Sequence, residues 1–358
     1  MKTGKLHTDL HEIKEMLDDY GSSSVLIVCD KFLTESETVK YIKSICDRTA
    51  VFSEFQPNPL FENVREGIRI FRENRCDCLI AIGGGSAIDV AKCIKLFEPM
   101  ADELDFLEQK YVKTTVPLIA IPTTCGTGSE ATRFAVIYYQ GVKQSINSTM
   151  IIPNQILLLP ELIKTLPDYQ KKATMLDALS QAIESYWSVN STDESKEYSR
   201  KAIPLILNNY QKYLENDETA IKNMQLAAYY AGEAINISQT TAAHAMSYKI
   251  TSLYHIPHGH AVAMCLMPIW EYMLTDKAEI IDPRGREYYL QTMQEIHDLL
   301  GGGLETYKAV YKSLNIDRKL DNPDDLDVLV KSVNTTRLKN HPVLLTDNII
   351  RELYLNCY

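Results

Sequence analysis

Short apolar runs that stop at chain-breaking residues recur through the first 160 residues of this sequence and constrain its fold most strongly. The runs are SVLIVC (24–29), CLIAI (78–82), LIAI (118–121) and ILLL (156–159). They are followed by Asp30, a glycine triplet, Pro122 and Pro160, and amphipathic stretches separate them. Continuous apolar runs of this length, alternating with helical patterns, are typical of buried strands in a parallel sheet. The sequence therefore predicts an α/β fold over this region.

Beyond Pro160 the pattern changes to long segments with a period of 3.6 residues and no further convincing strand. The clearest of these segments cover residues 169–188, 193–215 and 218–237. We therefore expect two domains, an α/β domain over residues 1–160 and an all-helical domain over residues 161–358. No long linker separates them, and two domains joined this directly usually hold a ligand in the cleft between them.

The composition is that of an ordinary globular protein of 358 residues, 45% of them hydrophobic, with a net charge of -10. A negative protein repels phosphate backbones and anionic lipid, which argues against nucleic acid and membrane surfaces as partners. The N-terminal segment is charged and lacks an apolar stretch long enough for a signal peptide or a membrane span. The eight cysteines are scattered and form no C-x-x-C pair, so we expect reduced thiols and a cytoplasmic protein.

Two of the predicted strands lead into loops that could bind a dinucleotide. In IAIGGGSAIDVAK (80–92) three glycines precede a helix, with Ser86 as its expected cap, so backbone amides could approach a pyrophosphate closely. In LIAIPTTCGTGSEAT (118–132) the loop is rich in hydroxyls, which suit ribose and phosphate. We expect both loops side by side at the carboxyl edge of the sheet, where open α/β folds bind ligands. For the first loop taken alone, a tight strand–helix turn that binds nothing is the alternative.

Asp30 ends the first predicted strand and has two possible roles. Its carboxylate could accept a hydrogen bond from the 2′-hydroxyl of the adenosine ribose, which would favour NAD over NADP. It could instead cap the segment that begins at Lys31, as Asp often does after a strand. The sequence leaves both roles open.

Potential metal ligands occur in the helical half. Asp177 and Gln181 are four residues apart in MLDALSQAIE (175–184), which places both side chains on one helix face. Four of the eight histidines lie at positions 244, 255, 258 and 260. One carboxylate and two imidazoles, with one position left open, are a plausible catalytic site for zinc or ferrous iron. Each histidine taken singly could equally be a surface or core residue, above all His255 and His260.

These motifs, in this order and spacing, resemble the iron-containing (group III) alcohol dehydrogenases, whose relatives include glycerol dehydrogenase and dehydroquinate synthase. The resemblance covers nearly the whole chain and rests on GGGSAIDVAK, the PNP triplet at 57–59, PTTCGTGSEAT, DALSQAIE and the AAH and PHG pair. It implies a dinucleotide-binding domain (1–160), an all-helical metal and substrate domain (161–358), and hydride transfer between NAD or NADP and a small aldehyde or alcohol. The implied metal is Fe²⁺ or Zn²⁺.

The resemblance also implies a set of site residues. The cofactor contacts would be Asp30, Asn58, Gly84, Gly85, Ser86, Thr123, Thr124, Thr127 and Lys143, and the metal ligands would be Asp177, Gln181, His244 and His258. Gln181 departs from the family, which has histidine there, and an amide oxygen is a weaker ligand for zinc or iron than imidazole. Tyr248 stands where the family has a second histidine near the nicotinamide. The usual N-terminal strand is shortened or absent.

Within the family, three segments look most like phosphonoacetaldehyde reductases, which make 2-hydroxyethylphosphonate. These segments are SEATRFAVIYYQGVKQS, AAHAMSYKITSLYHIPHGHA and VNTTRLKNHPV. A phosphonate dianion needs fixed cations. Arg133 follows the second glycine loop, and Arg337 and Lys339 lie near the C-terminus. Each of the three could alternatively be a solvated surface charge.

The expected mechanism places a divalent metal on Asp177, His244 and His258, where it polarises the aldehyde oxygen while the nicotinamide delivers hydride to the carbonyl carbon. Water or Tyr248 would supply the proton. The alternatives are another small alcohol substrate, a dehydroquinate-synthase-like lyase that uses NAD only transiently, and a cofactor-binding protein without catalysis. A homodimer is the default expectation for such an enzyme.

Overall fold

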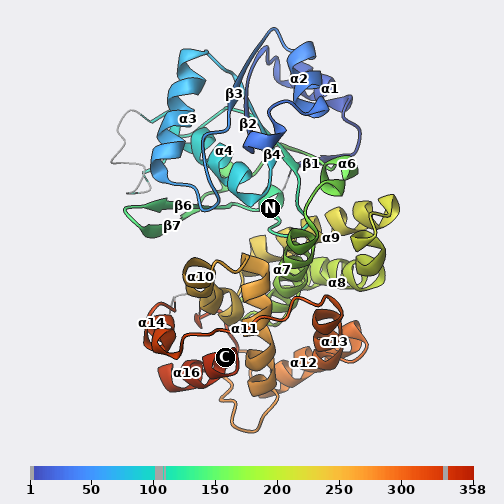
Figure 1. Ribbon diagram of the computed structural model, residues 1–358, viewed down its shortest axis with the longest axis vertical. Helices are drawn as coiled ribbons and strands as arrows, with labels where there is room; N and C mark the ends of the chain where they lie inside the picture. Colours follow the sequence, from blue (N-terminus) through green and yellow to red (C-terminus); the bar gives the residue numbers. More distant parts are fainter. Residues whose placement is uncertain (1–3, 101–107, 109, 334–337) are drawn as a thin grey trace. The chain divides into compact units, whose positions relative to one another are not determined.

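The computed structural model describes residues 4–100, 108, 110–333 and 338–358 of the chain. The chain forms two compact units, one comprising Met1–Thr124 and Gly128–Thr165 and the other comprising Cys125–Thr127 and Leu166–Tyr358. The first unit is built on a parallel sheet, and the second consists of helices (Figure 1). This is the fold class that the sequence predicts.

The sheet of the first unit has six parallel strands in the order β1-β8-β5-β4-β2-β3. The strands are β1 (Lys5–His7), β2 (Ser24–Cys29), β3 (Arg48–Phe52), β4 (Cys78–Gly83), β5 (Leu118–Pro122) and β8 (Gln155–Leu157). The four predicted runs are β2, β4, β5 and β8. The expected short N-terminal strand is β1, which pairs with β8 at the edge of the sheet.

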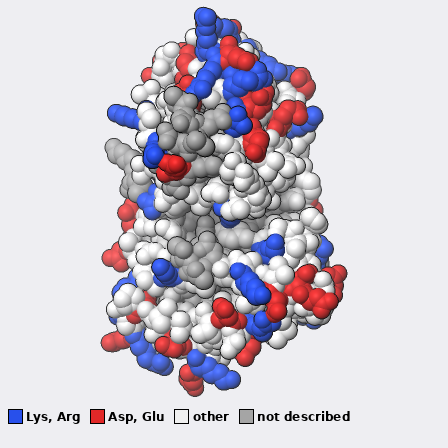
Figure 2. Space-filling view, turned by 90° about the vertical axis from the view of Figure 1, so that its left-hand side faces the viewer, with Lys and Arg blue, Asp and Glu red and all other residues white. Residues whose placement is uncertain are grey.

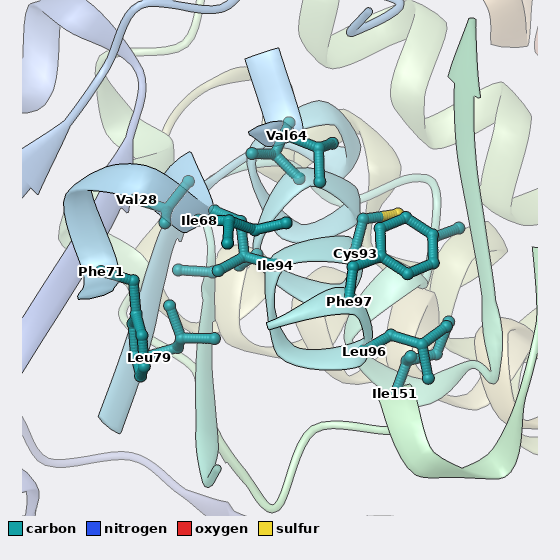
Figure 3. Close-up of a cluster of buried hydrophobic side chains, with 14 of the residues drawn as sticks. Val28, Val64, Ile68, Phe71, Leu79, Cys93, Ile94, Leu96, Phe97 and Ile151 are labelled. Atoms are coloured by element: carbon teal, nitrogen blue, oxygen red, sulfur yellow. The ribbon is translucent and has the colours of Figure 1, made fainter. Parts of the chain in front are cut away.

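Helices cover both faces of this sheet, which explains why its central strands β2, β4 and β5 are fully buried and largely apolar. Helices α1 (Glu12–Tyr20) and α2 (Glu37–Ile45) pack on the face that Val25 and Ile27 share. Helices α3 (Phe61–Glu73) and α4 (Gly85–Phe97) pack on the opposite face, which carries Leu26 and Val28. Figure 3 shows this second core, where side chains of α3 and α4 meet those of β2 and β4. Alternate strand residues therefore serve alternate cores.

An antiparallel hairpin follows β5 and was not predicted from the sequence. It consists of β6 (Phe134–Tyr139) and β7 (Val142–Asn147), joined by a turn in which Gln140 and Gly141 have positive φ. A short α6 (Pro160–Lys164) closes the first unit. The hairpin departs from the strand–helix–strand pattern expected for the whole region.

The second unit is helical, as the periodicity of the sequence predicts. Its helices are α7 (Asp168–Trp187), α8 (Asp193–Leu214), α9 (Glu218–Ser238), α10 (Ala242–Tyr254), α11 (His258–Met273), α12 (Arg286–Leu300), α13 (Leu304–Ser313), α14 (Leu326–Lys331) and α16 (Asp347–Leu355). Every residue of α7 from Met175 to Trp187 is buried, and α7 packs against α8, α9 and α11. Polar side chains in this part of α7 therefore lie inside the unit.

None of the helices in the described ranges has the length and apolar character needed to cross a bilayer. All eight cysteines are free thiols, as expected, and only Cys46 among them is not buried. On the face shown in Figure 2, Lys and Arg side chains lie among Asp and Glu side chains.

Candidate active site

The first glycine loop joins β4 to α4 without an intervening turn. Gly84 is the N-cap residue, in an extended conformation, and the helix begins at Gly85. The expectation that Ser86 caps this helix is wrong, because the helix starts earlier and Ser86 lies within its first turn. A Cβ at Gly83 would come within 2.6 Å of the Ala87 Cβ and 2.7 Å of an Asp30 carboxylate oxygen. Only glycine fits so close an approach.

Asp30 contacts this loop rather than the segment that follows it. Its Oδ2 accepts a hydrogen bond from the Gly84 amide at 3.4 Å, and its side chain makes no capping bond to the 3-10 turn Lys31–Leu33. Burial raises the pKa of Asp30 above its usual value. Of the two roles left open by the sequence, side-chain capping is therefore the one that the structure contradicts.

The second glycine loop lies beside the first, as expected. The Thr123 amide donates to the Gly83 carbonyl at 3.0 Å, which continues the β4–β5 pairing into the loops. A Cβ at Gly84 would lie 3.3 Å from the Thr124 methyl carbon. The ends of β2, β4 and β5 thus gather Asp30, Gly84, Thr123 and Thr124 at one edge of the sheet.

A buried ion and hydroxyl network fixes the second loop onto α4, and sequence reasoning missed it. The Lys92 ammonium donates to the hydroxyls of Ser129 and Thr132 at 3.0 and 3.1 Å. Ser129 in turn donates to the Asp89 carboxylate at 2.6 Å, and that carboxylate also accepts from the Val136 amide. Burial lowers the pKa of Lys92 to about 8. Lys92 and Asp89 both lie within the GGGSAIDVAK motif, so the motif contained the sequence signal that could have identified them.

The remaining cofactor candidates lie on separate elements. Asn58 follows β3 and has a φ of 61°, and Lys143 pairs with Tyr138 in the hairpin. Thr127 groups with the helical unit, where its carbonyl accepts from the Gln181 amide at 3.3 Å. The other six predicted cofactor residues lie at the ends of β2, β4 and β5, whereas these three belong to other segments of the chain.

Within the helical unit, Asp177, His244 and His258 converge. One ligand atom from each lies within 4.8 Å of the other two. The His244 Nε2 is 3.3 Å from the Asp177 Oδ1, and the two imidazole rings meet edge to face with centroids 5.4 Å apart. A carboxylate and two imidazoles at this separation form a donor set for a divalent transition metal.

Local structure brings these residues together. The backbone of His255 is left-handed and ends α10, and Pro257 then caps α11, so that His258 is the first residue of that helix. A Cβ on Gly259 would lie 2.1 Å from the Ala173 carbonyl oxygen and 2.6 Å from the Asp177 Cβ. The absence of a side chain at Gly259 therefore lets α11 approach α7 closely enough for His258 to reach Asp177.

Behind the donor group stands Glu184, to which the sequence analysis gave no role. Its carboxylate is fully buried and hydrogen-bonds the Nδ1 of His244. It also accepts from the Thr241 amide at 3.2 Å, the Thr241 hydroxyl at 2.6 Å and the Ala243 amide at 2.9 Å. A carboxylate that holds one imidazole nitrogen orients the other toward a metal, an arrangement common behind histidine ligands.

The charges of the group favour a cation. Burial alone would raise the pKa of Asp177 and of Glu184, yet the imidazoles, together with the other hydrogen bonds that these carboxylates accept, more than offset it and lower both pKa values. Although burial opposes protonation of His244, its two carboxylate neighbours raise the pKa of that imidazole to about 10. The side-chain oxygen of Gln181 is buried without a hydrogen-bond partner among the described residues. A divalent cation fits these donors and this charge.

The other candidates fall outside the donor group. His260 is a core residue, held between the hydroxyls of Tyr169 at 2.8 Å and Tyr311 at 2.9 Å, while His255 is exposed. Tyr248 stacks on the His258 ring with centroids 5.4 Å apart.

Of the three cationic residues suggested for phosphonate binding, the structure describes two. Arg133 precedes β6, and its guanidinium carbon lies 5.2 Å from the Phe134 ring centroid. Lys339 is exposed. Arg337 lies outside the described residues.

Comparison with known proteins places the chain in a family. The family model for iron-containing alcohol dehydrogenases matches residues 7–160, and the model for the C-terminal part of the Fe-containing alcohol dehydrogenase family matches residues 171–353. Together they cover most of the chain. The chain therefore belongs to the iron-containing alcohol dehydrogenase family, as its motifs indicate, and is an oxidoreductase of that type.

Individual relatives agree with this assignment. The chain is 33% identical over 278 residues to an NAD-dependent methanol dehydrogenase of Bacillus methanolicus. This matched region covers 75% of this chain and 73% of the relative. The chain is 31% identical over 311 residues to a 1,3-propanediol dehydrogenase of Klebsiella pneumoniae, covering 82% and 77%. Among solved structures, a sulfoacetaldehyde reductase from Bifidobacterium kashiwanohense in complex with NAD⁺ has a TM-score of 0.89 at 26% identity, covering 100% of this chain and 97% of that one.

Proposed function

We propose that this chain reduces a small aldehyde to its alcohol with NADH or NADPH at a metal-assisted site, and that the aldehyde is phosphonoacetaldehyde. The observation that carries the proposal is the buried group of Asp177, His244 and His258, backed by Glu184. Membership of a dehydrogenase family favours this activity over a lyase and over a protein without catalysis.

In this proposal Asp177, Gln181, His244 and His258 hold Fe²⁺ or Zn²⁺. A divalent ion bound there supplies Lewis acidity toward the carbonyl oxygen, and the nicotinamide supplies the hydride. The bond from Glu184 keeps the Nδ1 of His244 occupied and leaves the Nε2 as the donor atom. The proton for the product comes from water or from the Tyr248 hydroxyl.

The cofactor would be held at the sheet edge by Asp30, Asn58, Gly84, Gly85, Ser86, Thr123, Thr124, Thr127 and Lys143. A carboxylate at Asp30 would accept the ribose 2′-hydroxyl and repel a 2′-phosphate, which favours NADH over NADPH. The relatives named for NAD support this preference. Replacing Asp30 by Ser should lower the ratio of the KM for NADPH to the KM for NADH. An unchanged ratio would count against the proposed contact between Asp30 and the ribose.

The substrate assignment rests on a positively charged side chain near the second loop and on the sulfonate substrate in the name of one structural relative. Sulfonate and phosphonate are both tetrahedral oxyanions, which planar guanidinium groups recognise well. Arg133→Ala or Arg337→Ala should raise the KM for phosphonoacetaldehyde much more than the KM for propanal. Equal effects on the two aldehydes would refute the phosphonate, and a lower KM for sulfoacetaldehyde would assign the sulfonate instead.

His258→Ala tests the metal site directly. The variant should lose bound metal and activity while it keeps its circular dichroism spectrum and its affinity for NADH. Full activity in this variant would exclude the proposed ligands. We also propose that the protein is a cytoplasmic homodimer, and analytical ultracentrifugation of the purified protein tests the dimer.

A further inference from the structure

A cavity of about 410 Å³ lies at the amino-terminal edge of the parallel sheet in the first unit. Its lining includes the residues that lead into three strands, namely Gly4 before β1, residues 113–116 before β5 and residues 153–154 before β8. Because these strands are parallel, this edge is opposite to the carboxyl edge where the two glycine loops lie. The cavity is therefore separate from the proposed cofactor site.

Lys95 of α4 brings a buried ammonium group to the wall of this cavity. The residue is 4% exposed and is one of those that line the cavity. Its Nζ donates to the side-chain oxygen of Asn154 at 2.7 Å and to the Ile152 carbonyl at 3.4 Å, and both acceptors belong to lining residues. An ammonium group has three N–H donors. One donor of Lys95 is therefore left without an acceptor among the described residues.

The charge of Lys95 also lacks a counter-ion. Both of its acceptors are neutral oxygens, and in the described ranges it forms no ion pair with a carboxylate. Lys196 shows the usual arrangement, because it is equally buried at 4% exposure but lies 3.3 Å from a Glu295 carboxylate oxygen. Burial lowers the pKa of Lys95 to about 8, which still leaves its ammonium mostly protonated at pH 7. An uncompensated positive charge therefore stands at the cavity wall.

The rest of the lining suits an anion. Lys113 supplies a second ammonium group, and Thr114, Thr115 and Thr149 supply hydroxyls that can donate hydrogen bonds. No Asp or Glu is among the described residues that line the cavity. Lys113, Thr115 and Thr149 are exposed, so the cavity opens to solvent. A ligand can therefore enter and meet donors from several segments of the chain.

We propose that this cavity binds a small oxyanion, such as inorganic phosphate, with Lys95 as the principal cation and Lys113 as the second. A lysine ammonium binds phosphate as a point charge, and an oxyanion would supply both the missing acceptor and the missing counter-charge of Lys95. Two ammonium groups also match the charge of a doubly ionised oxyanion. The site lies apart from the proposed reacting groups, so the inference does not depend on the proposed reduction.

The experiment is a calorimetric titration of inorganic phosphate into the full-length protein saturated with NADH, with chloride at matched ionic strength as the reference. Saturation with NADH keeps phosphate away from the glycine loops. Lys95→Met removes the charge but keeps a long unbranched side chain, and should weaken phosphate binding at least about tenfold. Lys113→Met should weaken it about threefold, because solvent and salt screen an exposed charge.

Two control variants separate this cavity from other places where phosphate could bind. Lys171 is 3% exposed and donates to the side-chain oxygen of Asn216, but it belongs to the second unit and does not line the cavity. Lys171→Met therefore removes an equally buried ammonium elsewhere. Arg133→Ala removes a cation of the proposed phosphonate site. Both variants should keep the phosphate binding that Lys95→Met loses.

The outcomes separate this inference from the proposed function. If the unmodified protein binds no phosphate, or if Lys95→Met binds it equally well, the inference is overturned while the proposed reduction stands. If NADH does not bind, the proposed function fails, and the comparison with Lys95→Met still decides the anion site. Should Lys95→Met fail to fold, Lys113→Met replaces an exposed residue and provides the test, and an unchanged affinity for phosphate in that variant would overturn the inference.

Discussion

A single methyl group added at Gly259 should disrupt the metal site although no ligand residue is replaced. In Gly259→Ala the new Cβ would lie 2.1 Å from the Ala173 carbonyl oxygen, 2.6 Å from the Asp177 Cβ and 2.9 Å from the Asp177 amide nitrogen. Two of these three atoms belong to the backbone of α7, so no side-chain rotation can relieve the contact. Helix α11 must therefore move away from α7.

The size of the effect follows from these distances. To restore ordinary contact distances, α11 must move about one ångström away from α7. Overpacking of this kind typically costs about 1–3 kcal/mol of stability. A unit of this size should then melt about 2–10 °C lower. Metal–ligand distances tolerate only about 0.2 Å, and His258 is the neighbour of Gly259, so the affinity for metal should fall at least about tenfold.

Chelator competition and thermal unfolding of the metal-free protein check both effects. Gly301→Ala is the matched control, because Gly301 has a φ of 67° and open space around its Cβ. Placing alanine in that left-handed conformation costs about 1–2 kcal/mol, a similar loss of stability far from any clash with α7. The reasoning is refuted if Gly259→Ala binds metal as tightly as the unmodified protein, or if Gly301→Ala loses as much affinity.

Three further changes test other parts of the site. Glu184→Gln keeps the shape of the side chain but removes the charge behind His244, and should weaken metal binding about 10–100-fold in chelator competition; unchanged affinity would contradict that role. Burial lowers the pKa of His260 to about 4. Below about pH 6.5 the His260 imidazole is therefore protonated in the unfolded chain but stays neutral in the folded chain until about pH 4. The free energy of unfolding should therefore fall between about pH 6.5 and 4, and His260→Gln should flatten that fall in urea titrations; identical slopes would exclude the explanation. Asn340 donates from its side-chain amide to the Gln239 side chain at 3.2 Å, at a residue with a φ of 62°, and Asn340→Ala should cost about 1–3 kcal/mol in the same assay. A loss within the error of the urea extrapolation would show that this contact is dispensable.

The strands of the first unit were predictable where both faces are buried. Runs such as Ser24–Cys29 are buried at every position and apolar from Val25 onward, because helices cover both sides of the sheet. Strand β3 begins with Arg48 and is only half buried, so its sequence, RTAVF, is too polar to stand out as a buried strand. The hairpin of β6 and β7 was missed for a related reason, because the polar strand VKQSIN is largely accessible and gives no apolar run.

Some site residues can be recognised from the short motif around them, whereas the role of others depends on residues far away in the sequence. Asp177 and His258 sit in short motifs of metal-binding residue types, and the family resemblance assigns them as metal ligands. Glu184 cannot be recognised in this way, because its role depends on Thr241, which folds back onto it from 57 positions along the chain. An acidic residue in a helix is most often solvated, and only the burial of α7 shows that this one is not.

The most direct test is a coupled measurement on the metal-loaded protein with NADH and phosphonoacetaldehyde. NADH should be consumed in equal molar amount to the 2-hydroxyethylphosphonate formed, and the metal-free protein should consume none until Fe²⁺ or another divalent metal is restored. Turnover that is unaffected by stripping and restoring the metal would contradict the metal-assisted site. No net oxidation of NADH with any small aldehyde would contradict the reductase itself.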